Sequence, residues 1–257
     1  MVVLINKVNR VNQNDLIIGR HSTFETIKVN KNRINKIFLQ KNLNNSFYYK
    51  ILKTAKENKL IVEQVPKKKL DLMCENQNHQ GIILVISPYK YVTLDNLFDN
   101  ASYHNEFPFF LMLDDLNDPH NLGSIMRTAD AVGVHGIIIP KRHSVSLTST
   151  VSKISTGAIE HVPVTRVTNL TMTIRELKKR GLWIFGTKMN GEDYRKWNAD
   201  IPLCLVIGNE NKGVSPSIQK MVDCNITIPM IGHVQSLNAS VASGILMYQV
   251  FRSRHPL

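Results

Sequence analysis

The chain has 257 residues, of which 43% are hydrophobic and 20% charged, so it can bury a full hydrophobic core. No apolar run is long enough to span a bilayer, and Asn and Lys interrupt the first residues too early for a signal peptide. Its 3 cysteines are widely spaced, which argues against structural disulfides and a cysteine zinc site. We therefore expect a soluble cytoplasmic protein without a membrane partner.

The positive charge is concentrated in the first third of the chain. The net charge is +12; residues 1–90 contain 16 Lys and Arg against 6 Asp and Glu, whereas residues 91–257 contain 16 against 14. This asymmetry indicates one part that binds a polyanion and another with a different task. A lysine-rich surface that is merely solvated is equally compatible with the composition.

The first part of the chain is predicted to be a small α/β domain. Residues 1–14 show no periodicity and are expected to form a flexible tail. Residues 15–88 begin with a strand that turns at Gly19 into a helix capped near Ser22, with Glu25 as the capping-box partner. Further strands are predicted at 34–39, 60–65 and 81–87, and helices at 47–58 and 67–74.

Residues 89–107 lose this pattern and are predicted to be a linker, although 94–98 have helical spacing. Residues 108–257 then alternate short apolar strands with helices, which is typical of a parallel sheet. The predicted strands are 109–113, 136–139, 161–164, 182–186, 203–208 and 226–229.

The loop after the strand 109–113 carries the first candidate residues. Asn121 is suited to cap the following helix, and Arg127, about one and a half turns later, offers a planar fork to a phosphate or carboxylate. The alternative is a surface arginine that pairs with a loop aspartate. The loop has neither a G-x-G-x-x-G pattern nor a Walker lysine, so it lacks the phosphate-binding turn of nicotinamide or nucleoside triphosphate sites.

Two later loops follow apolar strands in the same way. Gly208 and Gly213 frame Glu210 in a tight turn; alternatively, this glutamate caps the helix that starts at Pro216 or Ser217. In the stretch 226–247, Ser236 or Asn238 can cap a helix whose free amides favour an anion or a polar ligand edge. Alone, this stretch is best interpreted as an ordinary β-loop-α unit. Together, the three loops predict a polar cluster at one sheet edge.

The residues of these loops resemble the three motifs of the SpoU branch of the SPOUT methyltransferases. The matching features are Asn121 and Arg127 after Asp118-Pro119, the G-x-E-x-x-G turn at 208–213, and the I-P-M…S-L-N-A-S-V-A segment at 228–242. The match covers about residues 108–255. The basic first part, ending in HQGIILVISPY, is more loosely similar to the ribosomal-protein-like substrate-binding domain of the members that modify 23S ribosomal RNA.

The resemblance implies an enzyme that transfers a methyl group from S-adenosylmethionine to a ribose 2′-hydroxyl of RNA. It also implies a deep trefoil knot, an exception to the rule of un-knotted chains, and a homodimer that completes the active site. By motif position, the methyl-transfer side is lined by Arg127, Asn121, Glu210, Ser236 and Asn238. The cofactor is surrounded by Gly186, Thr187, Gly208, Ile228, Met230 and Leu237.

The role of Arg127 stays open at this point. Attack on a sulfonium methyl needs in-line placement of the hydroxyl and loss of its proton. Free arginine is too basic to remove that proton, so the residue type favours a phosphate-holding role for Arg127. The family resemblance instead implies a base that the phosphate activates. We expect Glu210 to orient the arginine or its loop, and we expect no metal.

Several functions are compatible with these residues. The first expectation is methylation of a guanosine in 23S ribosomal RNA or a precursor of the large ribosomal subunit. The alternatives within the fold are a transfer-RNA 2′-O-methyltransferase and an antibiotic-resistance enzyme that methylates ribosomal RNA. A non-catalytic RNA-binding protein is the alternative outside this class, and the intact motif residues argue against it.

Overall fold

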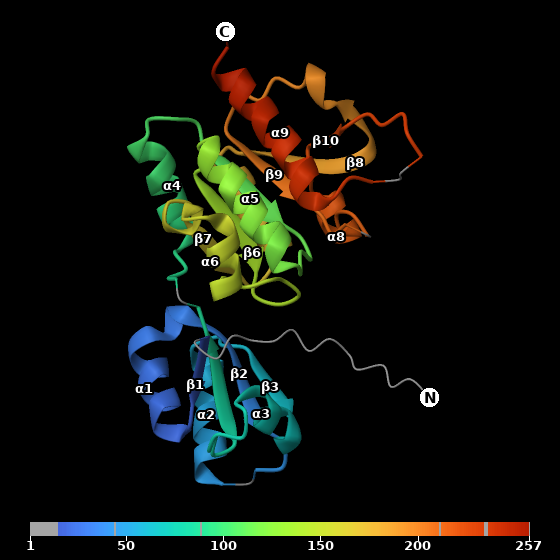
Figure 1. Cartoon of the computed structure of the whole chain (residues 1–257). Coiled ribbons are helices and arrows are strands. Elements are labelled where there is room, and N and C mark those ends of the chain that lie inside the picture. Colours follow the sequence, from blue (N-terminus) through green and yellow to red (C-terminus); the bar gives the residue numbers. More distant parts are fainter. Residues whose placement is uncertain (1–14, 44, 88, 211, 234–235, 257) are drawn as a thin grey trace. The chain divides into compact units, whose positions relative to one another are not determined.

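The computed structural model describes residues 15–43, 45–87, 89–210, 212–233 and 236–256, so the expected tail at 1–14 lies outside the described residues. The chain divides into two compact units, unit 1 at Met1–Lys90 and unit 2 at Tyr91–Leu257 (Figure 1). Much of the segment expected as a linker forms helix α4 (Leu94–Tyr103), and its Leu97 is buried in the core of unit 2. Within the described chain, no helix is both long and apolar enough to cross a membrane.

Unit 1 is a four-stranded mixed sheet with helices on both faces. The strand order is β1-β4-β2-β3; β4 is antiparallel to both of its neighbours, and β2 and β3 are parallel. The strands are β1 (Leu16–Ile18), β2 (Ile34–Gln40), β3 (Val62–Val65) and β4 (Ile82–Ile86). The helices are α1 (Arg20–Asn30), a 3-10 turn (Lys31–Arg33), α2 (Ser46–Glu57) and α3 (Lys67–Met73).

The pleat of the sheet explains the uninterrupted apolar run in β4. Ile82 and Leu84 pack in one core cluster with residues of α1 and α2, whereas Ile83 and Val85 pack in a second cluster with Leu70 of α3. Successive strand side chains point to opposite faces, so a strand covered on both faces needs apolar residues at every position.

Unit 2 contains six parallel strands in the order β10-β8-β9-β5-β6-β7. The strands are β5 (Phe109–Leu113), β6 (Gly136–Pro140), β7 (Val164–Val167), β8 (Trp183–Asp193), β9 (Leu203–Ile207) and β10 (Cys224–Thr227). Besides α4, the helices are α5 (Pro119–Ala131), α6 (Ser149–Ser155), α7 (Leu170–Lys179), α8 (Pro216–Gln219) and α9 (Ala239–Arg254). Short 3-10 turns lie at Ala158–Glu160 and Tyr194–Lys196.

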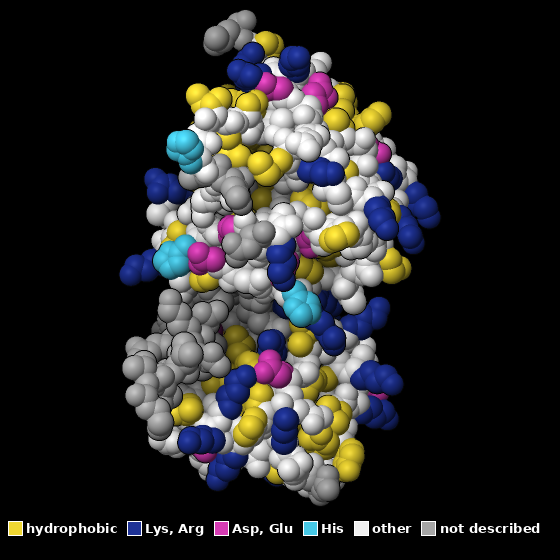
Figure 2. Space-filling view, turned by 90° about the vertical axis from the view of Figure 1, so that its right-hand side faces the viewer, with side chains coloured by type: hydrophobic (Ala, Val, Ile, Leu, Met, Phe, Trp, Pro, Cys, Tyr) yellow, Lys and Arg dark blue, Asp and Glu magenta, His cyan; other side chains and the backbone are white. Residues whose placement is uncertain are grey.

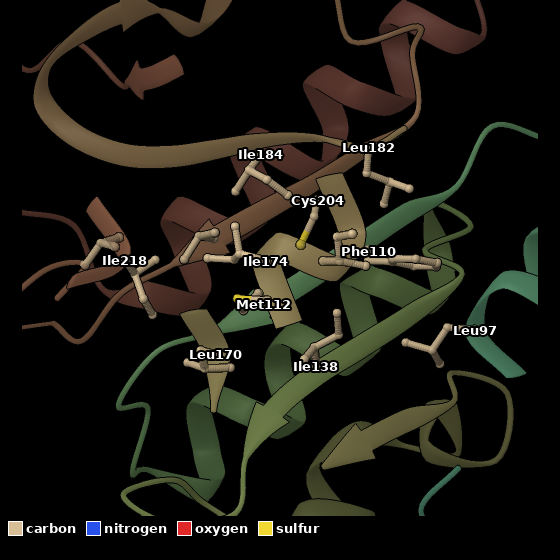
Figure 3. Close-up of a cluster of buried hydrophobic side chains, with 13 residues drawn as sticks. Leu97, Phe110, Met112, Ile138, Leu170, Ile174, Leu182, Ile184, Cys204 and Ile218 are labelled. Carbon is tan, nitrogen blue, oxygen red and sulfur yellow. The ribbon is translucent and has the colours of Figure 1, made fainter. Parts of the chain in front are cut away.

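The parallel sheet confirms the fold class predicted for this part of the chain. On one face of the sheet, Phe110 and Met112 of β5 and Cys204 of β9 pack against side chains of α4, α7 and α8 (Figure 3). Helices α5, α6 and α9 lie on the other face (Figure 1). The chain runs from β5 outward through β6 and β7, and β9 lies on the other side of β5. The loops after β5 and β9 therefore leave the sheet at its topological switch point, where open α/β sheets bind ligands.

Three predicted strands of unit 2 have boundaries that differ from the structure by two or more residues. The strand expected at 161–164 begins only at Val164, directly after Pro163, because the preceding residues wind into a 3-10 turn. β8 runs on to Asp193, since it pairs with β10 in two stretches separated by a register shift. β10 ends before Pro229, which has no N–H to donate to a sheet ladder.

The predicted cap of the first helix was wrong. α1 begins at Arg20 rather than after Ser22, and its N-cap is Gly19 at a φ of 92°, with no side-chain cap. Glycine adopts this backbone conformation readily, so the chain can turn directly from β1 into the helix. Glu25 does not complete a capping box; its carboxylate instead lies 3.1 Å from Nζ of Lys28.

Candidate active site

The loop after β5 places Asn121 inside the first turn of α5. Asp118 is the N-cap of this helix and accepts a hydrogen bond from the backbone N–H of His120 over 2.8 Å. Pro119 occupies the first helical position, where its missing N–H costs nothing. The predicted capping role of Asn121 was therefore wrong, because a residue in front of it already caps the helix. Asn121 is 6% exposed, and its amide is left to bind other groups.

The loop after β9 is a closed turn that contains Glu210. The backbone N–H of Gly213 donates to the carbonyl of Asn209 over 2.8 Å, and the reverse bond spans 3.1 Å. A Cβ placed on Gly208 would lie 2.2 Å from backbone atoms of Gly213 and Val214, so only glycine fits there. The alternative cap role of Glu210 does not hold, because the N-cap of α8 is Ser215.

Two hydrogen bonds tie these loops together beside the switch point. The carboxylate of Asp114 accepts from the backbone N–H of Ser215 over 2.7 Å. Nδ2 of Asn209 donates to the carbonyl of Asp115 over 2.9 Å. Asp114 was not among the residues predicted for the site, and its position directly after the buried strand β5 is the signal that could have identified it. These bonds hold Asn121 and Glu210 near each other.

The third loop joins the same group through Asn238. This residue is the N-cap of α9, as one of the two predicted caps, and its Oδ1 accepts from the backbone N–H of Ser240 over 2.9 Å. Its Nδ2 donates to Oδ1 of Asn121 over 3.0 Å. One asparagine thus caps a helix and contacts the first loop at the same time.

The result is a chain of three side chains, one from each loop. Nδ2 of Asn121 donates to Oε1 of Glu210 at short range, and Oδ1 of Asn121 accepts from Asn238. Asn121 therefore uses both ends of its amide, which fixes the orientation of its side chain. We call Glu210, Asn121 and Asn238 the polar triad. It contains three of the five side chains expected at the sheet edge, with the buried Asn121 in the middle.

The other residues expected on the methyl-transfer side are exposed. Arg127 lies on α5 and is exposed, and none of the described residues forms an ion pair or hydrogen bond with its guanidinium. The alternative of an arginine paired with a loop aspartate is thus not seen in the described chain. Ser236 is also exposed, two residues before the cap of α9, and takes no part in the polar triad.

The residues expected to surround a cofactor fall into two groups. Gly186 and Thr187 lie on β8, where Gly186 pairs with Val206 of β9, and Thr187 Oγ1 donates to the carbonyl of Val206 over 3.4 Å. Gly208 follows two residues after Val206, so these positions are neighbours.

Ile228, Met230 and Leu237 form the second group and are half-buried in the segments between β10 and α9. They lie outside the sheet ladder and outside any helix. Their backbone groups are therefore available to hydrogen-bond a heterocycle, and their apolar side chains are suited to pack against it. These are the properties that an adenosine-containing cofactor requires.

The environment of two cysteine thiols makes them weak nucleophiles. Burial raises the pKa of the Cys204 thiol, which packs in the core below the sheet. Burial also raises the pKa of Cys224, and the nearby Glu192 carboxylate acts in the same direction. Both thiols are therefore protonated at neutral pH and weak nucleophiles. Among the described residues, no group of three or more His, Cys, Asp or Glu side chains is arranged to hold a metal ion.

Comparison with known proteins identifies the family. Residues 108–248 match the SpoU rRNA Methylase family, and residues 16–92 match the family described as RNA 2′-O ribose methyltransferase substrate binding. The chain belongs to the SpoU family. It is 49% identical over 246 residues to the Bacillus subtilis protein named "Putative TrmH family tRNA/rRNA methyltransferase YacO", which covers 95% of this chain and 98% of that protein. The expected class, an RNA methyltransferase, is confirmed.

Solved structures show the same architecture. The SpoU methyltransferase AviRb from Streptomyces viridochromogenes, in complex with AdoMet, superposes with a TM-score of 0.58 at 22% identity, over 98% of this chain and 95% of that one. The TrmH/SpoU tRNA modifying enzyme of A. aeolicus has a TM-score of 0.53 at 34% identity, over 58% of this chain and 76% of that one. The first likeness extends over both units, and these structures share the fold of the chain.

Proposed function

We propose that the chain transfers the methyl group of S-adenosylmethionine to a ribose 2′-hydroxyl of RNA, and that the RNA is 23S ribosomal RNA modified at a guanosine. The observation that carries this proposal is the polar triad. Glu210, Asn121 and Asn238 come from three motif segments far apart in sequence, yet consecutive hydrogen bonds join them at the switch point of the sheet. Membership of the SpoU family supports the reaction type.

The cofactor assignment is supported by the residues around the triad. S-adenosylmethionine supplies an electrophilic methyl group on its sulfonium. We assign the pocket for its adenosine and methionine parts to Gly186, Thr187 and Gly208 on one side and to Ile228, Met230 and Leu237 on the other. The AviRb complex with AdoMet, which has the same fold, supports S-adenosylmethionine as the cofactor.

The chain's own residues then position the RNA. The forked guanidinium of Arg127 binds the phosphate next to the target ribose and directs the 2′-hydroxyl at the methyl group. In the reaction the bond between the ribose oxygen and the methyl carbon forms as the sulfur–methyl bond breaks, S-adenosylhomocysteine leaves as the neutral thioether, and the hydroxyl proton passes to water. Glu210 is held by Asn121, so its carboxylate acts as an orienting group. Ser236 and Asn238 complete the methyl-transfer side.

We further propose that two copies of unit 2 associate through α9. Val241 and Tyr248 are 51% and 54% exposed, and their spacing of seven residues places them on one face of the helix. Phe251 extends this face, with its ring centroid 6.1 Å from that of Tyr248. Apolar residues exposed together on a helix indicate a protein–protein contact. A symmetric dimer would bring a second copy close to the start of α9 and hence to the site.

The two units divide the work in this proposal. Unit 1, with residues 15–88 as its folded part, binds RNA in the cytoplasm; unit 2, from residue 108 on, carries the methyl transfer and the trefoil knot. The match of residues 16–92 to a substrate-binding family supports this assignment. The positive charge of unit 1 supports it as well: Figure 2 shows Lys and Arg side chains spread over the lower part of the molecule.

Mapping of ribose methylation in cells with and without the gene tests the substrate. We expect one 2′-O-methylguanosine of 23S ribosomal RNA to disappear without the gene and to return when purified protein and S-adenosylmethionine are added to that RNA or to precursor subunits. Loss of a transfer-RNA methyl group would identify the transfer-RNA alternative. Calorimetric titration with S-adenosylmethionine separates an enzyme from a pure RNA binder, which would release no heat.

A further inference from the structure

Unit 1 contains a polar hollow that the methyl-transfer reaction does not use. Its volume is about 690 Å³, within the range of ligand sites, and all its lining residues belong to unit 1. It lies between the start of α1, the end of β2, and the segment from α3 to β4. Five of its eleven lining residues carry side-chain amides: Gln40, Asn76, Gln77, Asn78 and Gln80.

A buried histidine holds the loop that presents these amides. Nδ1 of His79 accepts from the backbone N–H of Gly81 over 2.9 Å, so the ring proton lies on Nε2, which is 2.9 Å from a carboxylate oxygen of Asp71. His79 is 4% exposed. A Cβ on Gly81 would lie 2.5 Å from Leu43 Cδ1, so the loop approaches its neighbour closely. The wall of the hollow is therefore built and held in place rather than loose.

The backbone of the same loop carries several residues in the left-handed region. Glu75, Asn76 and Gln80 have φ values of 50°, 61° and 51°. Such conformations cost free energy for non-glycine residues and gather at functional sites. Here Gln77 and Asn78 are exposed, and within the described chain no hydrogen bond engages their side-chain amides. These two amides can thus bind a ligand without losing an internal partner.

Two cations complete the lining. The guanidinium of Arg20 lies 4.9 Å from the ring centroid of Phe47, and its Nε donates to the carbonyl of Gln80 over 3.2 Å, so the charge is held at the rim. Lys67 is exposed at the start of α3. The carboxylate of Asp71 is already engaged by His79. The hollow therefore combines net positive charge with amides that both donate and accept hydrogen bonds.

This combination fits one unpaired nucleotide. Asparagine and glutamine amides pair with the edges of bases, arginine and lysine bind phosphates, and protein recognition of RNA sequence relies on bases that are not in a duplex. A closed duplex would not insert a base into a hollow. We propose that this hollow binds an extruded nucleotide of the substrate RNA, with its base edge on Gln77 and Asn78 and its phosphate on Arg20 and Lys67. The inference rests on the proposed function, in that RNA is the substrate.

Equilibrium binding to two fluorescent RNAs tests the inference. The full chain is titrated with a mixed-sequence single strand and with the duplex of the same sequence. For the double variant Gln77→Ala and Asn78→Ala, we expect about a tenfold or greater loss of affinity for the single strand and little change for the duplex. The matched control is Gln64→Ala, an exposed amide on β3 outside the hollow, which should change neither.

A charge variant separates the phosphate contact from the base contact. Lys67→Ala should weaken binding of both RNAs and reduce the slope of log affinity against log salt by about 1.

Two results for the double amide variant would overturn the inference. One is an unchanged affinity for the single strand, and the other is an equal loss of affinity for the single strand and the duplex. Methyl transfer by the unaltered chain is measured alongside. If the unaltered chain methylates RNA while the amide variant binds RNA normally, the hollow is not a nucleotide site and the proposed function stands. If the unaltered chain neither binds nor methylates RNA, the nucleotide site and the proposed function are both wrong.

Discussion

Nδ2 of Asn238 donates a hydrogen bond to Oδ1 of Asn121 over 3.0 Å, although 117 residues separate them in sequence. Asn121 at the same time donates to Glu210, which lies 89 residues away in sequence. The side-chain amide of Asn121 thus joins the start of α5 to the start of α9 and to the turn after β9. A change at Asn121 should affect all three segments together.

Asn121→Ala should lower both stability and activity. The change removes a buried amide and leaves Glu210 and Asn238 without their shared partner, which should cost about 1–3 kcal/mol in the free energy of unfolding. Denaturant unfolding and methyl-transfer rates measure the two effects. Asn117→Ala, at an exposed asparagine of the same loop, is the matched control and should leave the transfer rate close to normal. Equal rates in the two variants would contradict a positioning role of the polar triad.

Arg127→Ala should abolish methyl transfer and leave cofactor affinity nearly unchanged. The guanidinium is exposed on α5, so its loss should not unfold the chain, but the RNA phosphate would lose its forked partner. We expect a fall in rate of at least about 100-fold, as for a misplaced reactant. Arg127→Lys keeps the charge without the fork and should recover only part of the rate. Arg175→Ala on α7 controls for loss of an exposed arginine. Retained activity in Arg127→Ala would refute the assignment.

Gly208→Ala should destabilise unit 2. The added methyl group would overlap the backbone of Gly213 and Val214, which cannot move as the end of a flexible side chain can. Overpacking of this kind costs about 1–3 kcal/mol. Gly232→Ala is the matched control, because a Cβ at Gly232 meets no atom within 4 Å. Comparison of the two unfolding midpoints checks the prediction, which fails if both variants unfold alike.

The stability of unit 2 should fall as the pH drops from about 6.5 to about 4. Burial lowers the pKa of His135 to about 4, and the nearby Glu106 carboxylate only partly opposes this. In that window the unfolded chain binds a proton at this ring and the folded chain does not, so up to about 3 kcal/mol is lost on acidification. Above pH 6.5 the imidazole of His135 is neutral in both the folded and the unfolded chain, so no stability is lost through this group.

His135→Asn should flatten this pH dependence. The asparagine oxygen can replace Nδ1 of His135, which accepts from the backbone N–H of Phe109 over 3.1 Å. His143→Asn, at an exposed histidine, should keep the slope of the unaltered chain. Unfolding curves at several pH values between 4 and 8 distinguish the variants. An unchanged slope in His135→Asn would mean that another group is responsible.

Tyr248→Glu should dissociate the proposed dimer. A carboxylate placed in the middle of the apolar face of α9 would have to be buried without a partner in the interface. Sedimentation velocity should then show monomers at concentrations where the unaltered chain is dimeric. Met172→Glu, at another exposed apolar side chain on α7, should remain dimeric. If the unaltered chain is itself monomeric, the interface proposal is wrong.

Much of the fold follows from short-range patterns in the sequence. The apolar run 81–87 predicts a strand, and the structure places β4 there with α1 and α2 covering one face and α3 the other. The predicted ends of helices and strands were less accurate where a single glycine or proline, rather than the apolar periodicity, sets the boundary. Gly19 caps α1 three residues before the expected cap at Ser22, and Pro229 is left outside β10.

The arrangement of the candidate site could be predicted only in part. The position of each loop at a strand end followed from periodicity, and family motifs singled out Asn121, Glu210 and Asn238. The bonds among them could not be inferred, because spacing within a sequence carries no distance between remote segments. The same holds for Asp114, whose partner Ser215 lies 101 residues away.

The place of Asn238 in the chain also sets when the site can form. Domains emerge from the ribosome with their N-terminal part first, so unit 1 can fold while unit 2 is still being synthesised. The bond between Asn238 and Asn121 closes only after β10 has been made and α9 has begun, by which time the other five strands of the sheet already exist. A nascent chain could therefore hold RNA through unit 1 before it is able to modify it.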